Sequence, residues 1–172
     1  MSEDVKNNLK LTARNEEDLK VISAYSQDSI VSIRDIVFLK KNRIFIMVTN
    51  RFMWEALQKK FERKNIKRIR SALKFEEVLK VRSKKINQKN KNRNLECLAI
   101  QCDEKLNNNY EVKIFFSGDG VITLTLEAID VILQDLGKPW EAKYLPKHKI
   151  WRLIYLLILN KTMNKKKGDR IG

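Results

Sequence analysis

The stretch from Ser117 to Gly120 reads Ser-Gly-Asp-Gly, and its residue types could do chemistry. Glycine-rich loops bind phosphate when they connect a strand to the first turn of a helix, because helical N–H groups then point at the anion. Here the residues that follow, Val121 to Leu126, alternate and are rich in β-branched side chains, which is typical of a strand. We therefore interpret Gly118-Asp119-Gly120 as the tight turn of a β-hairpin, in which glycine supplies the positive φ.

Other reactive side chains are few and dispersed. Cys97 and Cys102 are the two cysteines, and their odd separation on a strand would put them on opposite faces, which disfavours a disulfide and fits a reducing cytoplasm. The one histidine, His148, lies far away in a basic segment, so neither a metal site nor a histidine-based nucleophile is indicated. The sequence assigns no catalytic, cofactor-binding or metal-binding residue, although a site assembled from scattered residues stays open.

The formal net charge of +15 is unevenly distributed along the chain. Residues 58–93 carry fifteen Lys and Arg against three Glu, and residues 138–172 carry ten against two acidic residues. Residues 94–137, between them, are acidic, with eight Asp and Glu against two Lys. Such asymmetry favours a polyanionic partner, either nucleic acid or an anionic surface.

The candidate polyanion-binding residues lie in the middle basic segment. They are Lys59, Lys60, Arg63, Lys64, Lys67, Arg68, Arg70, Arg82, Lys84 and Lys85, continued by Lys89, Lys91 and Arg93. Because Phe61 and Phe75 are the two aromatic residues in residues 59–93, we expect phosphate contacts without sequence preference. The interpretation that we prefer for the charge is that lysine reflects an A/T-rich genome and solubilises the surface. Lysine outnumbers arginine, and asparagine and isoleucine are abundant.

The first half of the chain predicts a strand, a helix and a hairpin. Residues 9–12 alternate as a strand does, and Asn15 followed by three acidic residues marks a helix start that extends to about Gln27. Two apolar, β-branched runs, residues 30–39 and 44–48, are separated by four polar residues, which predicts a hairpin. The second run is apolar on both faces, so we expect it in the middle of a sheet, covered on each side.

Residues 72–83 predict a strand that carries Leu73 and Phe75 on one side, with Glu77 on the same side. Glu77 is either partly buried among these apolar residues or lies near a strand end or pairs with a lysine. Residues 84–94 form a polar loop, and two further strands follow at about 95–102 and 110–116.

Two further helices are predicted from apolar spacing. Residues 53–61 show a short amphipathic pattern. Ile129, Ile132, Leu133 and Leu136 follow the i, i+3, i+4, i+7 rule, and a glycine stands where a C-cap would, which predicts a helix over residues 129–136 that covers the sheet.

The chain ends in an apolar segment followed by basic residues. Residues 150–159 contain one charge in ten positions, and Lys161, Lys165, Lys166, Lys167 and Arg170 follow. A ten-residue helix would be about 15 Å long, half of a hydrocarbon core, so no transmembrane span is indicated. Packing on the domain, a homo-oligomer contact through residues 150–159 and an interfacial anchor on anionic lipid are the three interpretations.

Several ordered motifs resemble a known family. They are LKLTARNEEDLKVISAYSQDSIVSIRDIVFL from Leu9, NRF-x-WE at Asn50 to Glu55, LKFEEVLKVRSKKI, and the GDG hairpin leading into EAIDVILQDLG. Together they resemble the alphaproteobacterial proteins catalogued as domain of unknown function 2948, over roughly residues 9–145. The resemblance implies a compact cytoplasmic bacterial protein and brings no activity, cofactor or catalytic residue with it.

Taken together, the sequence predicts one α+β domain over residues 1–149 and an extension over residues 150–172. We expect about seven mostly antiparallel strands, a helix near the N-terminus and an amphipathic helix after the last hairpin, with a pleckstrin-homology-like roll as the alternative. A non-enzymatic binding or structural module is the leading hypothesis for function. Nucleic-acid binding through residues 59–93 and an enzyme with a dispersed site are the alternatives.

Overall fold

The structure is a computed structural model, and it describes residues 8–55, 66–104 and 107–143. Its elements are, in chain order, β1 (Lys10–Ala13), α1 (Glu16–Ser26), β2 (Ile30–Leu39), the short 3-10 helix η2 (Lys40–Asn42), β3 (Ile44–Phe52), β4 (Lys67–Phe75), β5 (Val78–Lys84), β6 (Asn94–Glu104), β7 (Tyr110–Phe116), β8 (Val121–Leu126) and β9 (Val131–Glu141).

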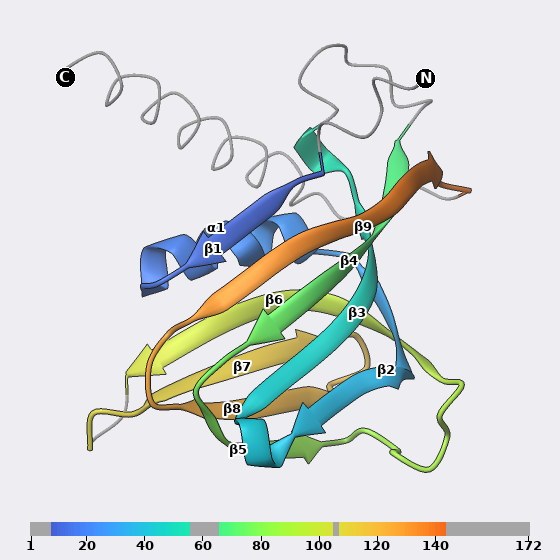
Figure 1. The fold of residues 1–172 in the computed structure, drawn as a ribbon. Helices are drawn as coiled ribbons and strands as arrows, with labels where there is room; N and C mark the ends of the chain where they lie inside the picture. The colour runs from blue at the N-terminus through green and yellow to red at the C-terminus, as the bar shows by residue number, and fades with distance from the viewer. Residues whose placement is uncertain (1–7, 56–65, 105–106, 144–172) are drawn as a thin grey trace, which may run out of the picture.

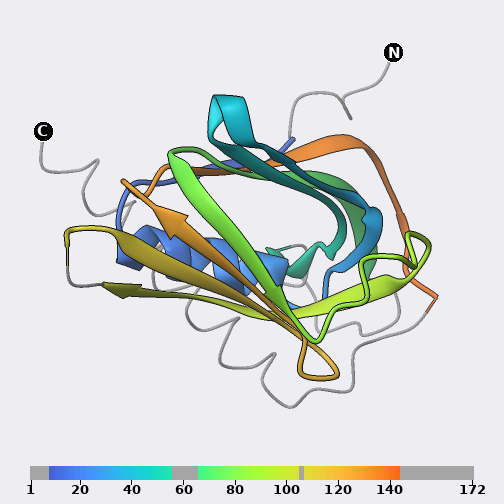
Figure 2. The same ribbon diagram turned by 90° about the horizontal axis from the view of Figure 1, so that it is seen from below.

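Within the described residues, nine strands form one antiparallel sheet in the order β1-β9-β4-β3-β2-β6-β7-β8-β5. The sheet curls back on itself at β2, which pairs with β3 at both of its ends and with β6 through Ile30 to Ser32. We call β1, β9, β4, β3 and β2 the first half-sheet, and β6, β7, β8 and β5 the second half-sheet. Helix α1 lies in the space between the two halves (Figure 1, Figure 2).

Helix α1 forms where the local sequence predicts it. Asn15 is the N-cap, and its Oδ1 accepts a hydrogen bond from the Asp18 N–H at 2.8 Å. Three acidic residues in the first turn meet the positive end of the helix dipole. Leu19 and Ile22 are buried, so the helix turns its apolar stripe into the core.

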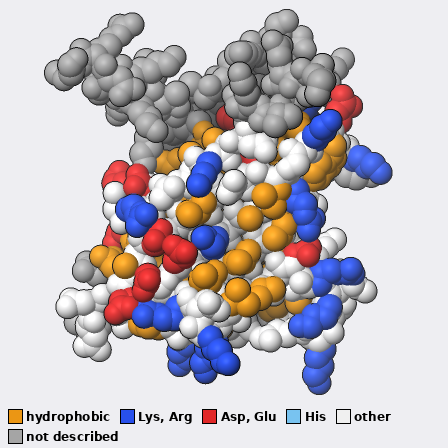
Figure 3. All heavy atoms as spheres, in the orientation of Figure 1, with side chains coloured by type: hydrophobic (Ala, Val, Ile, Leu, Met, Phe, Trp, Pro, Cys, Tyr) orange, Lys and Arg blue, Asp and Glu red, His pale blue; other side chains and the backbone are white. Residues whose placement is uncertain are grey.

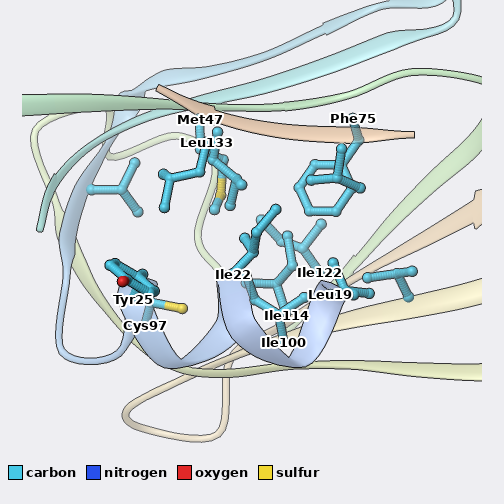
Figure 4. Packing of buried hydrophobic residues seen from close by; sticks show 14 of the residues in the cluster. Leu19, Ile22, Tyr25, Met47, Phe75, Cys97, Ile100, Ile114, Ile122 and Leu133 are labelled. Atoms are coloured by element: carbon cyan, nitrogen blue, oxygen red, sulfur yellow. The ribbon is translucent and has the colours of Figure 1, made fainter. Parts of the chain in front are cut away.

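The core is filled from both half-sheets and from α1, as the alternation of buried and half-exposed residues along β3 and β8 requires. Figure 4 shows the packing at close range. The labelled side chains are Met47, Phe75 and Leu133 of the first half-sheet, Leu19, Ile22 and Tyr25 of α1, and Cys97, Ile100, Ile114 and Ile122 of the second half-sheet.

The segment predicted as one strand over residues 72–83 is two strands, so that prediction is wrong. β4 ends at Phe75, β5 begins at Val78, and Glu77 between them has a φ of 57°, in the left-handed region. The chain turns there from the first half-sheet to the second, because β4 pairs with β3 and β9 whereas β5 pairs with β8. Glu77 is therefore exposed, and its carboxylate pairs with the Arg43 guanidinium at 3.2 Å.

The helix predicted for residues 129–136 is also wrong, because this segment leads into strand β9. Val131, Leu133 and Asp135 are buried and alternate with residues that are more exposed. The third inward position is occupied by Asp135. The apolar residues alone therefore do not show the two-residue period of a strand, and their spacing resembles that of a helix. Gly137, with a φ of 73°, lies at an irregularity in the pairing of β9 with β4 and does not cap a helix.

Other predictions are confirmed. β2 and β3 form the expected hairpin, and β3 lies between β4 and β2 in the interior of the first half-sheet. Gly118 and Asp119, with φ of 77° and 66°, form the turn between β7 and β8. The interpretation of the glycine motif as a hairpin turn is therefore confirmed. The fold is α+β, with one helix and nine antiparallel strands in the described part of the chain.

Some predictions lie outside the described residues. The short helix over residues 53–61 falls largely there, and so does the whole apolar segment over residues 150–159. A pleckstrin-homology-like roll needs a helix after the last strand, and the described chain, which continues to residue 143, contains none after β9.

Candidate functional site

Arg51 is the centre of the most concentrated polar cluster among the described residues. Its guanidinium is fully buried at the end of β3. Its Nε–H and one Nη2–H donate to the two oxygens of Asp135 at 2.8 and 2.7 Å. Glu55 accepts from Nη1 and Nη2 at 3.0 and 2.7 Å, and the carbonyl oxygen of Phe52 accepts from Nη1 at 3.0 Å. All five N–H donors of this arginine are therefore used within the chain.

The motif from Asn50 to Glu55 builds this cluster. The rings of Phe52 and Trp54 have centroids 5.2 Å apart, and the Trp54 Nε1–H donates to the Gln27 carbonyl at 3.2 Å, just beyond α1. The Tyr25 ring of α1 lies with its centroid 5.6 Å from the Arg51 guanidinium carbon. The motif thus joins the end of β3 to the end of α1.

Burial sets the electrostatics of the cluster. Burial alone would lower the pKa of Arg51, but the hydrogen bonds that Arg51 donates to Asp135 and Glu55 more than offset this effect, so the pKa is raised. Burial, followed by the charge on Glu55, raises the pKa of the Tyr25 hydroxyl. The Ser71 hydroxyl donates to Asp135 Oδ1 at 2.6 Å, which ties β4 into the same network.

This arrangement is suited to holding strands together rather than to catalysis. A substrate-binding arginine offers free donors to a carboxylate or phosphate, whereas Arg51 has none to offer. The sequence analysis missed the cluster because its members come from β3, β4 and β9. The one signal in the sequence was Arg51 and Asp135, charged residues at inward positions of otherwise apolar strands.

The predicted polyanion-binding residues that the structure describes lie on β4, on β5 and in the loop after β5. Lys59, Lys60, Arg63 and Lys64 lie outside the described residues. Lys67, Arg68 and Arg70 lie on β4, Arg82 and Lys84 lie on β5, and Lys85 follows β5 directly. In the order of the sheet, β4 and β5 are separated by β3, β2, β6, β7 and β8.

Several of these side chains already have partners. Arg70 pairs with Asp35 at 3.7 Å and Arg82 with Glu111 at 2.9 Å. The Arg68 guanidinium lies 3.7 Å from the centroid of the Phe52 ring. These contacts leave less of the basic segment available to phosphate than the sequence predicts.

The outer face of the first half-sheet, turned away from α1, is apolar. We name the apolar outer face by its eight aliphatic residues: Val37, Leu39, Ile44, Ile46, Val48, Ala72, Ile132 and Leu136. Val37, Leu39 and Leu136 are 44%, 43% and 39% exposed. Figure 3 shows hydrophobic side chains gathered in the middle of this face. The central strand β3 was expected to be covered on both sides, but these residues leave its outer side accessible.

The outer face of the second half-sheet is different. Many cross-strand neighbours there are polar or charged, as where Thr123 of β8 lies between Lys113 of β7 and Arg82 of β5, although Phe115 and Val121 also lie on this face. Lys113 pairs with Glu111 at 3.5 Å, and Glu111 pairs with Arg82. This is the composition of a solvated sheet face. The apolar residues of the first half-sheet are thus a local feature of one face.

Charged side chains border the apolar outer face. Figure 3 shows Lys and Arg side chains along one margin, and Asp and Glu side chains mixed with Lys and Arg towards the other. The basic margin contains Arg34, Arg70, Lys91 and Arg93, because the loop after β5 hydrogen-bonds along β2. The mixed margin contains Glu76, Glu77, Glu127 and Asp130 at the turns that connect the two half-sheets, where Lys74, Arg43 and Arg14 pair with them.

Other chemistry is sparse. Within residues 8–55, 66–104 and 107–143, no three His, Cys, Asp or Glu side chains are grouped so that they could hold a metal ion. In those same ranges no helix has the length and apolarity that a membrane crossing needs. Burial raises the pKa of the Cys97 thiol to about 12, so this thiol is protonated at neutral pH.

Comparisons with known proteins give one match. Residues 9–148 match the model of a family described as "Protein of unknown function (DUF2948)". No curated protein and no solved structure matches the chain.

Proposed function

Because the chain belongs to the DUF2948 family, described only as proteins of unknown function, we propose a function from its geometry: a non-enzymatic binding module that docks a protein on the apolar outer face. The observation that carries this proposal is the exposure of Val37, Leu39 and Leu136 on one continuous sheet face. Contiguous exposed apolar residues with a polar rim are typical of protein interaction sites.

The dimensions of the apolar outer face suit a protein partner. Four neighbouring strands span about 14 Å across, and Ile44 to Val48 span about 13 Å along β3. A flat patch of this size can be covered by another sheet or by one helix. The aliphatic side chains offer little to nucleic-acid bases, which stack on aromatic rings. Trp140 is 41% exposed and is paired in register with Arg68, so these two residues extend the face. Tryptophan and arginine are enriched among the residues that dominate the energetics of interfaces.

A photo-crosslinking amino acid at Val37 tests the proposal in living cells. Thr123, on the outer face of the second half-sheet, is the matched control position. We expect discrete protein adducts from Val37 and none from Thr123. Equal labelling from both positions, or none from Val37, contradicts docking on this face.

A second candidate function is polyanion binding, and it is favoured by the basic margin. The backbone N–H of Arg34 donates to the Lys91 carbonyl at 3.0 Å, which brings the basic loop after β5 alongside β2. Sequence reasoning missed the contribution of Arg34 because it lies outside the basic segment.

The test is a mobility-shift titration with DNA and RNA at two salt concentrations. Phosphate contacts predict affinity that falls steeply as salt rises and weakens in a variant with Arg34→Ala and Lys91→Ala. Affinity that barely changes with salt, or that survives the double substitution, contradicts a phosphate-binding margin. Lys113→Ala on the second half-sheet is the control.

A further inference from the structure

We propose that the apolar outer face binds a second copy of this chain, face to face, around a two-fold axis that crosses the strands level with Met47 and Leu73. The inference rests on the proposed function, and it names the partner. Its basis is that Arg70 and Glu76 lie at opposite ends of the outward side of β4, so this strand is complementary to itself once it is turned end for end.

The order of side chains along β4 carries the argument. The outward positions read Arg70, Ala72, Lys74, followed by Glu76 just after the strand. Leu73, which is buried and points to the core, lies midway between Arg70 and Glu76. The two charges are about 20 Å apart along the chain direction. A two-fold axis level with Leu73 therefore exchanges the basic end with the acidic end.

The same operation pairs the apolar residues well. Met47 lies opposite Leu73 in the sheet, so on β3 the axis exchanges Ile46 with Val48. Ile46 of one copy then packs on Val48 of the second copy. Two sheets packed in this way have side chains that interdigitate about 10 Å apart. The apolar residues at the centre become buried without any change in the fold of either copy.

Lys74 is the one charged residue near the centre, and the symmetry accommodates it. The axis sets Lys74 of one copy over Ala72 of the second copy, so a long side chain meets a small one. The Lys74 ammonium already pairs with Glu76 at 3.2 Å, so its charge stays compensated. Arg70 of the second copy arrives at this same Glu76. Isologous contacts of this kind are the commonest route to a homodimer.

The strength of the contact follows from its size. The apolar centre is smaller than the roughly 800 Å² that each partner buries in a stable complex, even when the charged margins are added. We therefore expect a reversible monomer–dimer equilibrium. Sedimentation equilibrium on the full chain, over a wide concentration range, measures it directly.

Ile46→Asp tests the apolar centre. Ile46 points outward, so the substitution leaves the core intact, and circular dichroism on the same sample verifies that the variant is folded. We expect the dimer dissociation constant to rise at least about tenfold, as for a central interface residue. Thr123→Asp, on the other outer face, is the matched control and leaves the equilibrium unchanged.

A charge exchange tests the geometry of the axis. Arg70→Glu places two carboxylates together across the axis, and Glu76→Arg places two guanidinium groups together, so each variant alone is expected to be monomeric. An equimolar mixture of the two variants restores both attractive pairs and is expected to form a heterodimer. Arg82→Glu, the same charge change on the second half-sheet, is the control and dimerises as wild type does.

Each other outcome overturns the inference. A chain that is monomeric at every concentration excludes the second copy as the partner, while adducts to another protein from Val37 would still support docking on this face. A dimer that survives Ile46→Asp, or that is lost on Leu156→Asp in residues 150–159, has its interface elsewhere. A mixture of the charge variants that stays monomeric removes the proposed axis.

Discussion

Two arginines, one at each end of β3, each meet two carboxylates, but in different surroundings. Arg51 and its partners Asp135 and Glu55 have side chains that are 0%, 2% and 24% exposed. Arg43, directly before β3, pairs with Glu77 and Glu127, and these three side chains are 39%, 47% and 57% exposed. Each group consists of one arginine and two carboxylates, so the two groups have the same formal charge. The difference teaches that burial, more than the number of ion pairs, decides what such a cluster does for the fold.

The two clusters also frame the proposed interface. β3 runs through the middle of the apolar outer face, with Arg43 before its first residue and Arg51 near its last. The buried cluster joins β3 to β4, β9 and α1, whereas the exposed cluster joins the turns between the half-sheets. We therefore expect substitutions at Arg51 to disturb the whole face and substitutions at Arg43 to disturb one corner.

The largest effect is expected from Arg51→Leu. This change leaves Asp135 and Glu55 shielded from water without their counterion, and breaking a buried pair in this way costs about 3–5 kcal/mol. Urea unfolding followed by circular dichroism measures the loss. The double variant Arg51→Leu with Asp135→Leu is the control and should recover part of the stability, because it removes the stranded charge. A single variant as stable as wild type would contradict a buried, structural Arg51.

A smaller loss is expected from Asp135→Asn. The asparagine amide keeps the shape of the side chain, but its NH₂ group replaces one carboxylate oxygen. That NH₂ group then faces an N–H donor of Arg51 or the Ser71 hydroxyl, which loses its acceptor. Leaving one buried donor without an acceptor costs about 1–3 kcal/mol. The same unfolding measurement applies, with Asp103→Asn on the exposed face of β6 as the control. A loss equal to that of Arg51→Leu would mean that Glu55 contributes little.

Tyr25, which lies beside Arg51, is expected to make the stability of the buried cluster depend on pH at alkaline values. The pKa of Tyr25 is raised, first by burial and then by the charge on Glu55, so the folded protein holds this proton more tightly than the unfolded chain does. The corresponding stability is complete below the usual tyrosine pKa of about 10 and is lost as the pH rises above it. We expect Tyr25→Phe to lose less stability than wild type between neutral pH and about pH 10.5. Parallel losses in wild type, Tyr25→Phe and the control Tyr110→Phe would contradict this.

The smallest effect is expected from Arg43→Ala. A hydrogen bond from Arg43 lowers the pKa of Glu127, so any stability it provides is present above the ordinary glutamate pKa of 4.5 and is lost as the pH falls through the lowered value. Because both side chains are exposed, solvent screens the pair. We expect unfolding curves at neutral pH that overlap those of wild type. A loss comparable to that of Asp135→Asn would remove the contrast between the two clusters.

Local physics explains which elements could be predicted. The Asn15 cap and the acidic first turn act within a few residues, so α1 was visible in the sequence. The Gly118-Asp119 turn is equally local. β9 was mistaken for a helix because Asp135 occupies an inward position, and its reason for being there is Arg51, 84 residues away. Glu77 lies where the chain changes half-sheet, and no local pattern in the sequence predicts that change.

The sequence by itself determined the α+β class, the family, the N-terminal helix and the hairpins, because caps, turns and alternation act between neighbours in the chain. The tertiary structure alone decided that Arg51, Asp135, Glu55 and Ser71 meet, since strand pairing brings together residues that no local pattern links. It also decided that the aliphatic residues of four strands share one outer face. Alternation assigns residues to two sides of a strand, but only the curl of the sheet around α1 decides which side becomes core and which is left for a partner.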